Sequence, residues 1–142
     1  MNKYVVTLAA LTLAASAQAH DLGFAGLLSS TNSEELAPLT LASGKPVADA
    51  PYTLKSGTYY EIEIIADGSA ELALSGGDFF RAIWIDELVI NDIELRPMGM
   101  HSLEFDDEGT AELGFIAIVP GRYELKIPGS NGESQKAVFV IQ

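Results

Sequence analysis

The chain has 142 residues, no cysteine, and 20 Asp and Glu against eight Lys and Arg, which gives a net charge of −12. This charge excludes nucleic acid and anionic membrane surfaces as expected partners, because both are negatively charged. The lack of cysteine excludes thiol nucleophiles, iron–sulfur clusters and Cys-type zinc sites.

Residues 1–19 have the pattern of a secretory signal peptide. Lys3 precedes a short apolar run, and small-residue cleavage sites end at Ala17 and Ala19. The run is shorter than the roughly 20 apolar residues of a membrane span, and no later segment is long and apolar enough to be one. We therefore expect export to a bacterial periplasm. Cleavage after Ala19 leaves 123 residues with a net charge of −13, enough for one domain.

The next segment, residues 20–45, is polar and rich in small residues, and we expect an N-terminal arm or an opening strand there. Residues 46–142 change to the period of β-strands. Residues 59–65 alternate clearly, with the isoleucines at 62 and 64 on one face and the glutamates on the other. A second short strand is predicted at 70–74, before a Ser-Gly-Gly-Asp turn.

Residues 79–90 fit either a short helix or two strands. We expect an irregular excursion, followed by a strand that continues through Ile93 and Leu95. Short strands and frequent turns predict an all-β, antiparallel domain. The remaining strands are predicted at 101–106, 111–117, 123–127 and 137–141.

Several of these stretches resemble cupredoxins. Residues 109–115, followed by Pro-Gly-Arg-Tyr-Glu-Leu at 120–125, are similar to the family's C-terminal half, where a strand and a Pro-Gly turn lead to the copper loop. Residues 54–64 resemble the family's upstream turn and strand, and residues 136–140 its closing strand. The resemblance covers roughly residues 46–142 and implies a cupredoxin-like, antiparallel Greek-key β-sandwich.

The resemblance does not extend to the ligands of blue (type 1) copper, which are a Cys thiolate, two His and usually a weak axial Met. The family's cysteine position falls at Ile127, and the axial Met position falls near Ser134. No histidine lies at the upstream position near residues 70–72. The resemblance therefore implies the fold without blue-copper electron transfer.

Met98, Met100 and His101 are candidate ligands for copper of another kind. Thioethers with an imidazole suit Cu(I), and an imidazole suits Cu(II) or zinc. In an extended chain the two methionines point away from His101, so a site requires residues 97–99 to turn. The alternative is structural: methionines that fill one end of the sandwich and a histidine satisfied by hydrogen bonds.

His20 is a further candidate metal ligand. Cleavage after Ala19 places its imidazole beside a new N-terminal amine, and His101 is the only other histidine in the sequence. Cleavage after Ala17 places His20 third from the amine, an arrangement that chelates Cu(II) and Ni(II). The alternative is that His20 simply follows a cleavage site.

Phe79, Phe80 and Trp84 lie within six residues and form a candidate partner-binding surface if their rings are exposed. The alternative places them in the core. The acidic turn at 106–109 lacks the spacing of a calcium loop, and the carboxylates at 86, 87, 92 and 94 are not placed around a cleft by any pattern. We therefore predict no enzyme.

Two functions remain. The first is an exported periplasmic protein that binds or handles copper without a blue-copper centre. The second is a non-catalytic periplasmic module that binds a protein or a small ligand with no metal, through the aromatic segment 79–84 or the acidic face.

Overall fold

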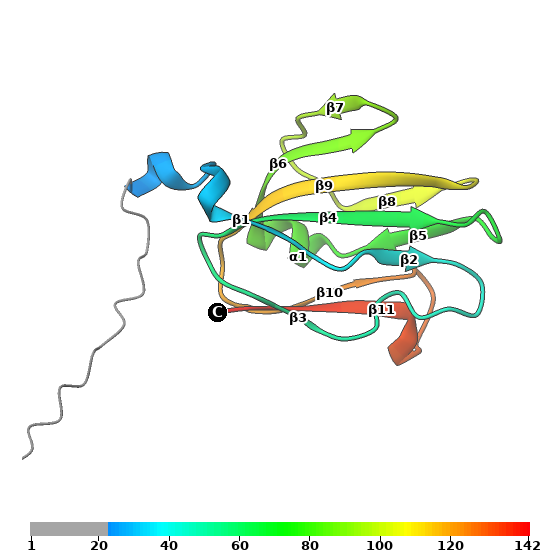
Figure 1. Ribbon diagram of the computed structural model, residues 1–142. Helices are drawn as coiled ribbons and strands as arrows, with labels where there is room; N and C mark the ends of the chain where they lie inside the picture. The colour runs from blue at the N-terminus through cyan, green and yellow to red at the C-terminus, as the bar shows by residue number, and fades with distance from the viewer. Residues whose placement is uncertain (1–22) are drawn as a thin grey trace, which may run out of the picture.

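The computed structural model describes residues 23–142 and folds them into two facing β-sheets (Figure 1). The first sheet has the order β1-β4-β9-β6-β7, and β2 also pairs with β4; the second has the order β3-β11-β10-β5-β8. The predicted β-sandwich is thereby confirmed. The strands of the first sheet are β1 (Ser33–Glu35), β2 (Leu39–Leu41), β4 (Tyr59–Ala66), β6 (Ile83–Ile90), β7 (Ile93–Leu95) and β9 (Gly109–Ala117). Those of the second are β3 (Tyr52–Leu54), β5 (Leu72–Ser75), β8 (Ser102–Phe105), β10 (Gly121–Lys126) and β11 (Lys136–Ile141).

Both sheets are mixed rather than wholly antiparallel. Strands β1 and β2 run parallel to β4, and β3 runs parallel to β11. The other pairs in the described part of the chain are antiparallel, as predicted. Strands β1, β2 and β3 each lie at a sheet edge and come from the first 54 residues of the chain. Alternation shows which residues share a face, but it does not show the direction in which an edge strand pairs.

Strand β4 shows why the alternating segments form the sandwich. Tyr60, Ile62 and Ile64 are buried between the sheets, as the sequence predicts. The antiparallel register with β9 places Phe115 beside Tyr60 and Leu113 beside Ile62. One face of each strand thus supplies the core, and the glutamates of β4 lie on the opposite face.

Residues 77–95 correct the prediction for this region. The expected irregular excursion is a short helix, α1 (Gly77–Ala82), which leads directly into β6. The strand expected to continue through Ile93 and Leu95 instead reverses at Asn91 and Asp92, whose φ angles are 48° and 62°. Positive φ at both central residues is the geometry of a type I′ hairpin turn, so β6 and β7 form an antiparallel hairpin.

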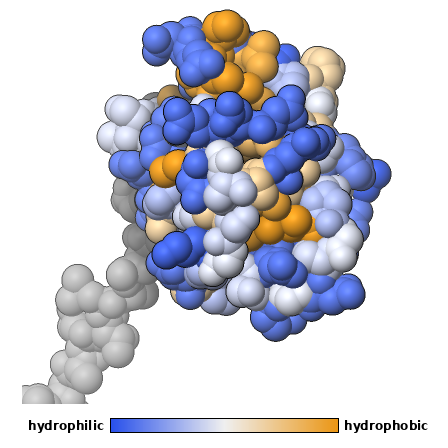
Figure 2. All heavy atoms as spheres, turned by 90° about the vertical axis from the view of Figure 1, so that its right-hand side faces the viewer, coloured by the Kyte–Doolittle hydropathy of each residue, from blue (hydrophilic) through white to orange (hydrophobic). Residues whose placement is uncertain are grey.

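This β6–β7 hairpin extends beyond the rest of the first sheet (Figure 1). Ile93 is 62% exposed and Leu95 is 44% exposed. Figure 2 shows hydrophobic surface at the top of the molecule, at the hairpin's turn, above a surface that is otherwise largely hydrophilic. Strand β7 is therefore an exposed sheet edge that carries apolar side chains.

The core is joined across the two sheets by Phe79 of α1. Its ring is fully buried and lies 4.3 Å from the ring of Phe139 on β11, measured between centroids. On the other side it lies 5.7 Å from the ring of Phe115 on β9. The short helix thus places one aromatic ring between strands of both sheets.

The remaining short elements are the 3₁₀-helices Gly23–Gly26, Ser30–Asn32 and Glu133–Gln135. No helix within residues 23–142 is long and apolar enough to cross a membrane. The predicted signal peptide at residues 1–19 and the candidate ligand His20 lie outside the described residues.

Candidate functional site

The loop between β7 and β8, residues 96–101, carries three of the candidate metal ligands. The Met98 side chain is fully exposed and His101 is exposed, whereas Met100 is half-buried and packs against the core. Around Gly99, no atom lies within 4 Å of the position that a side chain would take. The loop therefore presents one thioether and one imidazole to solvent, while the second thioether faces the protein.

His101 connects this loop to the start of α1. Its backbone carbonyl accepts a hydrogen bond from the Gly76 amide at 3.1 Å. Its imidazole lies against Gly77, beside the Arg81 guanidinium, in the space that a Gly77 side chain would fill. The imidazole is thus positioned by neighbouring elements but remains open to solvent.

The position of the family's copper cysteine is occupied by a hydrocarbon side chain. Ile127 packs against the core at the end of β10. Its amide donates to the Gln135 carbonyl at 3.0 Å, and its carbonyl accepts from the Ser130 hydroxyl at 2.6 Å. The loop that holds copper in cupredoxins is therefore a hydrogen-bonded turn here, without a thiolate, imidazole or thioether in residues 127–135.

Three carboxylates meet where β5 and β8 pair. Ligand oxygens of Glu71, Glu104 and Asp106 all lie within 4.8 Å of one another. A hydrogen bond to Glu71, together with repulsion from Glu71 and Asp106, raises the pKa of Glu104. The sequence analysis missed this cluster because it depends on the β5–β8 register, Ala73↔Glu104. All three side chains are exposed, and exposed acidic groups commonly gather without an ion, so we assign no metal to them.

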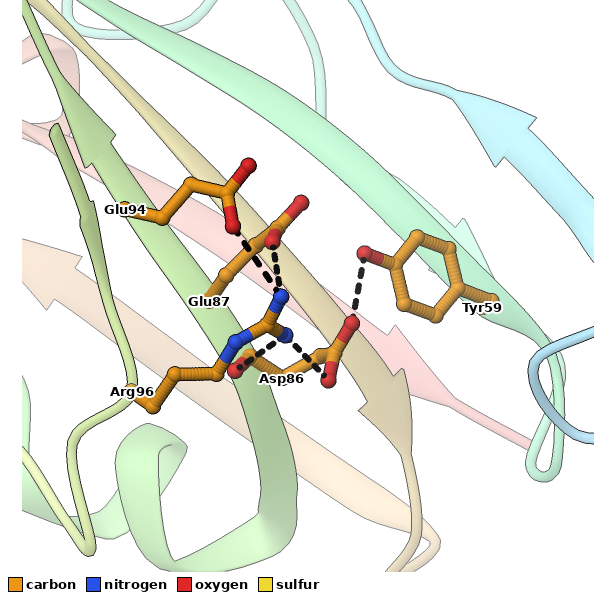
Figure 3. Close-up of polar contacts among 5 residues, drawn as sticks. All are labelled: Tyr59, Asp86, Glu87, Glu94 and Arg96. Atoms are coloured by element: carbon orange, nitrogen blue, oxygen red, sulfur yellow. Dashed lines mark hydrogen bonds and ion pairs between the residues drawn. The ribbon is translucent and has the colours of Figure 1, made fainter. Parts of the chain in front are cut away.

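A second acidic cluster surrounds Arg96 (Figure 3). One guanidinium nitrogen lies 2.8 Å from Asp86 Oδ1, and the other lies 2.9 Å from Glu87 and 3.2 Å from Glu94. A β-bulge between Ile85 and Glu87 allows Asp86 and Glu87 to reach the same cation. Three of the four carboxylates that the sequence could not place around a cleft are thus gathered around a single arginine; Asp92 lies in the β6–β7 turn instead.

Tyr59 also belongs to this cluster, and its hydroxyl group stays protonated. Its hydroxyl donates to Asp86 Oδ2 at 3.4 Å, in the space left by Gly114, where a side chain would contact the Tyr59 hydroxyl. Burial, followed by repulsion from Asp86 and Glu87, raises the pKa of Tyr59 far above its usual range. The cluster therefore links β4, β6 and the end of β7 through the contacts of Tyr59, Asp86 and Arg96.

The three aromatic residues proposed as a partner surface separate in the structure. Phe79 and Phe80 are buried and lie in the core, which is the alternative that the sequence left open. Trp84 is 47% exposed on the outer face of the first sheet, directly opposite Ile116 of β9. Only Trp84 of this group is accessible to a partner.

Comparison with protein-family models and with curated proteins finds no match. Solved structures match in fold. A laccase-like multicopper oxidase from Ochrobactrum sp. has a TM-score of 0.56 and 12% identity, over 80% of this chain and 32% of the oxidase. A multicopper oxidase from Pseudomonas thermotolerans has a TM-score of 0.55 and 13% identity, over 79% of this chain and 30% of the oxidase. A copper nitrite reductase from Nitrosomonas europaea has a TM-score of 0.52 and 19% identity, over 67% of this chain and 33% of the reductase.

The chain spans about a third of the length of these three copper proteins. At such low identity the comparison shows the fold alone. It agrees with the two-sheet arrangement and with the resemblance read from the sequence. The chain therefore has the cupredoxin-like fold, without the cysteine that a type 1 copper site requires.

Proposed function

We propose that the chain is an exported, periplasmic cupredoxin-like protein that binds copper at the loop of residues 96–101 and not at a blue-copper centre. The observation that carries this proposal is the joint exposure of Met98 and His101 on one short loop. The open space around Gly99 allows the loop to fold around an ion. Such an exposed site suits exchange of copper with a partner better than permanent storage.

Two further observations support copper as the metal. A thioether and an imidazole form a ligand set that suits Cu(I), and Met100 supplies a second thioether when the loop turns. The solved structures of similar fold are multicopper oxidases and a copper nitrite reductase. The signal-peptide pattern of residues 1–19 supports export.

Titration calorimetry of the metal-free protein tests the proposal. We expect one Cu(I) ion to bind with a Kd below about 10 μM, which corresponds to about −7 kcal/mol. Met98→Leu and His101→Asn are each expected to weaken binding by about tenfold or more, because each removes a ligand. Binding weaker than this limit in the wild-type protein contradicts a copper function.

His20→Asn is the matched control, because it removes the other imidazole of the chain. It is expected to leave Cu(I) binding at the loop unchanged. Cu(I) binding that is lost in His20→Asn and retained in His101→Asn assigns the site to the mature N-terminus and contradicts the loop.

A second function, binding of a basic protein surface without metal, is favoured by the outer face of the first sheet. Trp84 lies on this face opposite Ile116, and Glu61, Glu63 and Glu112 lie two to four residues further along β4 and β9. Glu63 lies directly opposite Glu112, and like charges in this arrangement destabilise a sheet unless a cation neutralises them. A sheet face that carries both a partly exposed tryptophan and several carboxylates suits a partner that presents basic and apolar groups.

Affinity capture from a periplasmic extract tests this second function. We expect Trp84→Ala to abolish capture of a partner that the wild-type protein retains, with the thermal unfolding midpoint unchanged. Phe24→Ala, which truncates an aromatic ring that is 94% exposed elsewhere, is the control and is expected to retain capture. If both variants capture the partner as well as the wild-type protein does, Trp84 is not part of the interface.

A further inference from the structure

A groove of about 680 Å³ runs between α1 and β10, and neither function above uses it. Its volume lies in the range of small-molecule sites in proteins. Strand β5 pairs with β10 only at Ser75↔Lys126, so the rest of that edge of β10 faces α1 instead of a strand. Three cationic side chains line the groove: Arg81 from α1, and Arg122 and Lys126 from β10.

Positive charge is concentrated at this place in an otherwise acidic protein. Residues 23–142 contain seven Lys and Arg, and three of them line the groove. A fourth, Lys136, lies directly opposite Lys126 in the β10–β11 ladder. In a chain with a net charge of −12, more than half of the described cations thus lie around one groove.

The two acidic side chains of the groove do not neutralise its cations strongly, so these cations can still pair with a bound anion. Glu124 lines the groove, but its Oε1 atom lies 3.0 Å from Nζ of Lys136, which does not line the groove. The same oxygen lies 3.9 Å from the Arg122 guanidinium. Asp78 lies 2.9 Å from Arg81, but both side chains are highly exposed, and such pairs contribute little and exchange readily.

Lys126 is the cation that most requires a counter-charge. Like charges directly opposite in a sheet are destabilising, and Lys126 faces Lys136 in this way. Lys136 has two glutamate partners, Glu124 and Glu133, each at 3.0 Å. Among the described residues Lys126 has no ion-pair partner, and its cross-strand neighbour on the other side is Ser75, whose side chain is a hydroxyl.

Two glycines shape the wall of the groove. At Gly76 a side chain would collide with the Glu124 carbonyl and the Leu125 side chain, so only glycine allows the chain to pass this close to β10. At Gly77 a Cβ atom would lie 3.0 Å from the His101 imidazole and 3.5 Å from Arg81 Nη1, so a side chain there would crowd the imidazole. The sequence Ser-Gly-Gly, read earlier only as a turn, thus lets the start of α1 pack closely against β10 and form one wall of the groove.

We propose that this groove binds a small multivalent oxyanion, a carboxylate or phosphate compound, through Arg81, Arg122 and Lys126. The planar guanidinium groups pair with two oxygens of a carboxylate or phosphate, and the ammonium group contributes a point charge. The ligand supplies the counter-charge that Lys126 lacks. A small ligand fits better than an acidic surface, because the binding groups line a recess between α1 and β10.

Calorimetric titration of the full, metal-free protein with citrate and, separately, with inorganic phosphate tests the proposal. We expect saturable one-to-one binding of at least one of them; the one that binds more tightly identifies the class of oxyanion. Lys126→Ala and Arg122→Ala are each expected to weaken binding by about tenfold or more, as the loss of a charged hydrogen bond requires. Because copper is absent, the result is independent of the copper site.

Two controls separate this site from a general response to charge. Lys45→Ala and Lys55→Ala remove the same charge outside the groove and are expected to change binding less than twofold. Glu124→Gln removes a carboxylate from the groove and is expected to tighten binding, which a purely structural role for these residues does not predict. Absence of saturable binding to both anions, or equal weakening by Lys45→Ala and Lys126→Ala, overturns the proposal.

Discussion

Replacing Phe79 with alanine is expected to lower the free energy of unfolding by about 3–5 kcal/mol, the range for loss of a large aromatic side chain from a core. The ring is fully buried and contacts Phe80, Phe115 and Phe139. Because these partners belong to the helix and to both sheets, the cavity cannot close by the shift of one side chain. Folded domains are stable by about 5–15 kcal/mol, so the variant should lose a large part of its stability. Urea denaturation followed by tyrosine and tryptophan fluorescence measures the change.

Phe24→Ala is the matched control for this prediction. It removes the same side chain from a site that is 94% exposed, and its effect should be within about 0.5 kcal/mol. A double variant with Phe139→Ala should destabilise by less than the sum of the two single changes, because the two rings stack on each other. Equal effects of Phe79→Ala and Phe24→Ala would show that α1 does not hold the sheets together.

The strands of the sandwich could be predicted because each buries one face. Tyr60, Ile62 and Ile64 alternate with polar residues in the sequence, and the structure buries these three side chains. The β6–β7 hairpin could not be predicted in this way, because Asn91-Asp92 lacks the glycine that usually marks a type I′ turn. In α1 and β6 the apolar residues are interrupted only by Arg81, Asp86 and Glu87, at positions that fit neither the helical nor the strand period.

The candidate sites show a similar limit. Met98 and His101 could be named as ligands because their chemistry is local to four residues, and their exposure is consistent with that choice. The groups that meet across strands could not be named. Arg96 joins three carboxylates only because β6 bulges, and Lys126 faces Lys136 only because of the β10–β11 register. Register depends on the whole fold, so such pairs become visible only in the structure.

The end of strand β10 shows how the fold is kept although the copper ligands are absent. In cupredoxins the chain leaves the strand after the Pro-Gly turn and supplies a thiolate; here it supplies Ile127, which packs against the core. The Ser130 hydroxyl and the Gln135 carbonyl then close the loop with hydrogen bonds. Packing and hydrogen bonds thus hold this end of the β-sandwich together without a metal. We therefore expect binding sites in the exposed loops and grooves.

Replacing Gly76 with alanine is expected to destabilise the fold by about 3 kcal/mol, at the upper end of the usual effect of overpacking. The added methyl group would collide with the Glu124 carbonyl and the Leu125 side chain. Neither can move away freely: Glu124 pairs with Val138 across β10 and β11, and Leu125 is buried. Gly76 cannot retreat either, because its amide donates to the His101 carbonyl and its own carbonyl accepts from the Phe80 amide.

Gly99→Ala makes the same chemical change in open space, with no atom within 4 Å of the new methyl group. Its unfolding free energy should differ from that of the wild-type protein by no more than about 0.5 kcal/mol. Alanine also reduces the conformational entropy of the unfolded chain equally in both variants, so the difference between them isolates the collision at Gly76. Because Gly76 joins β5 to α1, the Gly76→Ala variant should also lose oxyanion binding in the groove, whereas Gly99→Ala should retain it. Equal stability of the two variants in urea denaturation would mean that α1 does not pass as close to β10 as the fold requires, and the groove would lose its wall.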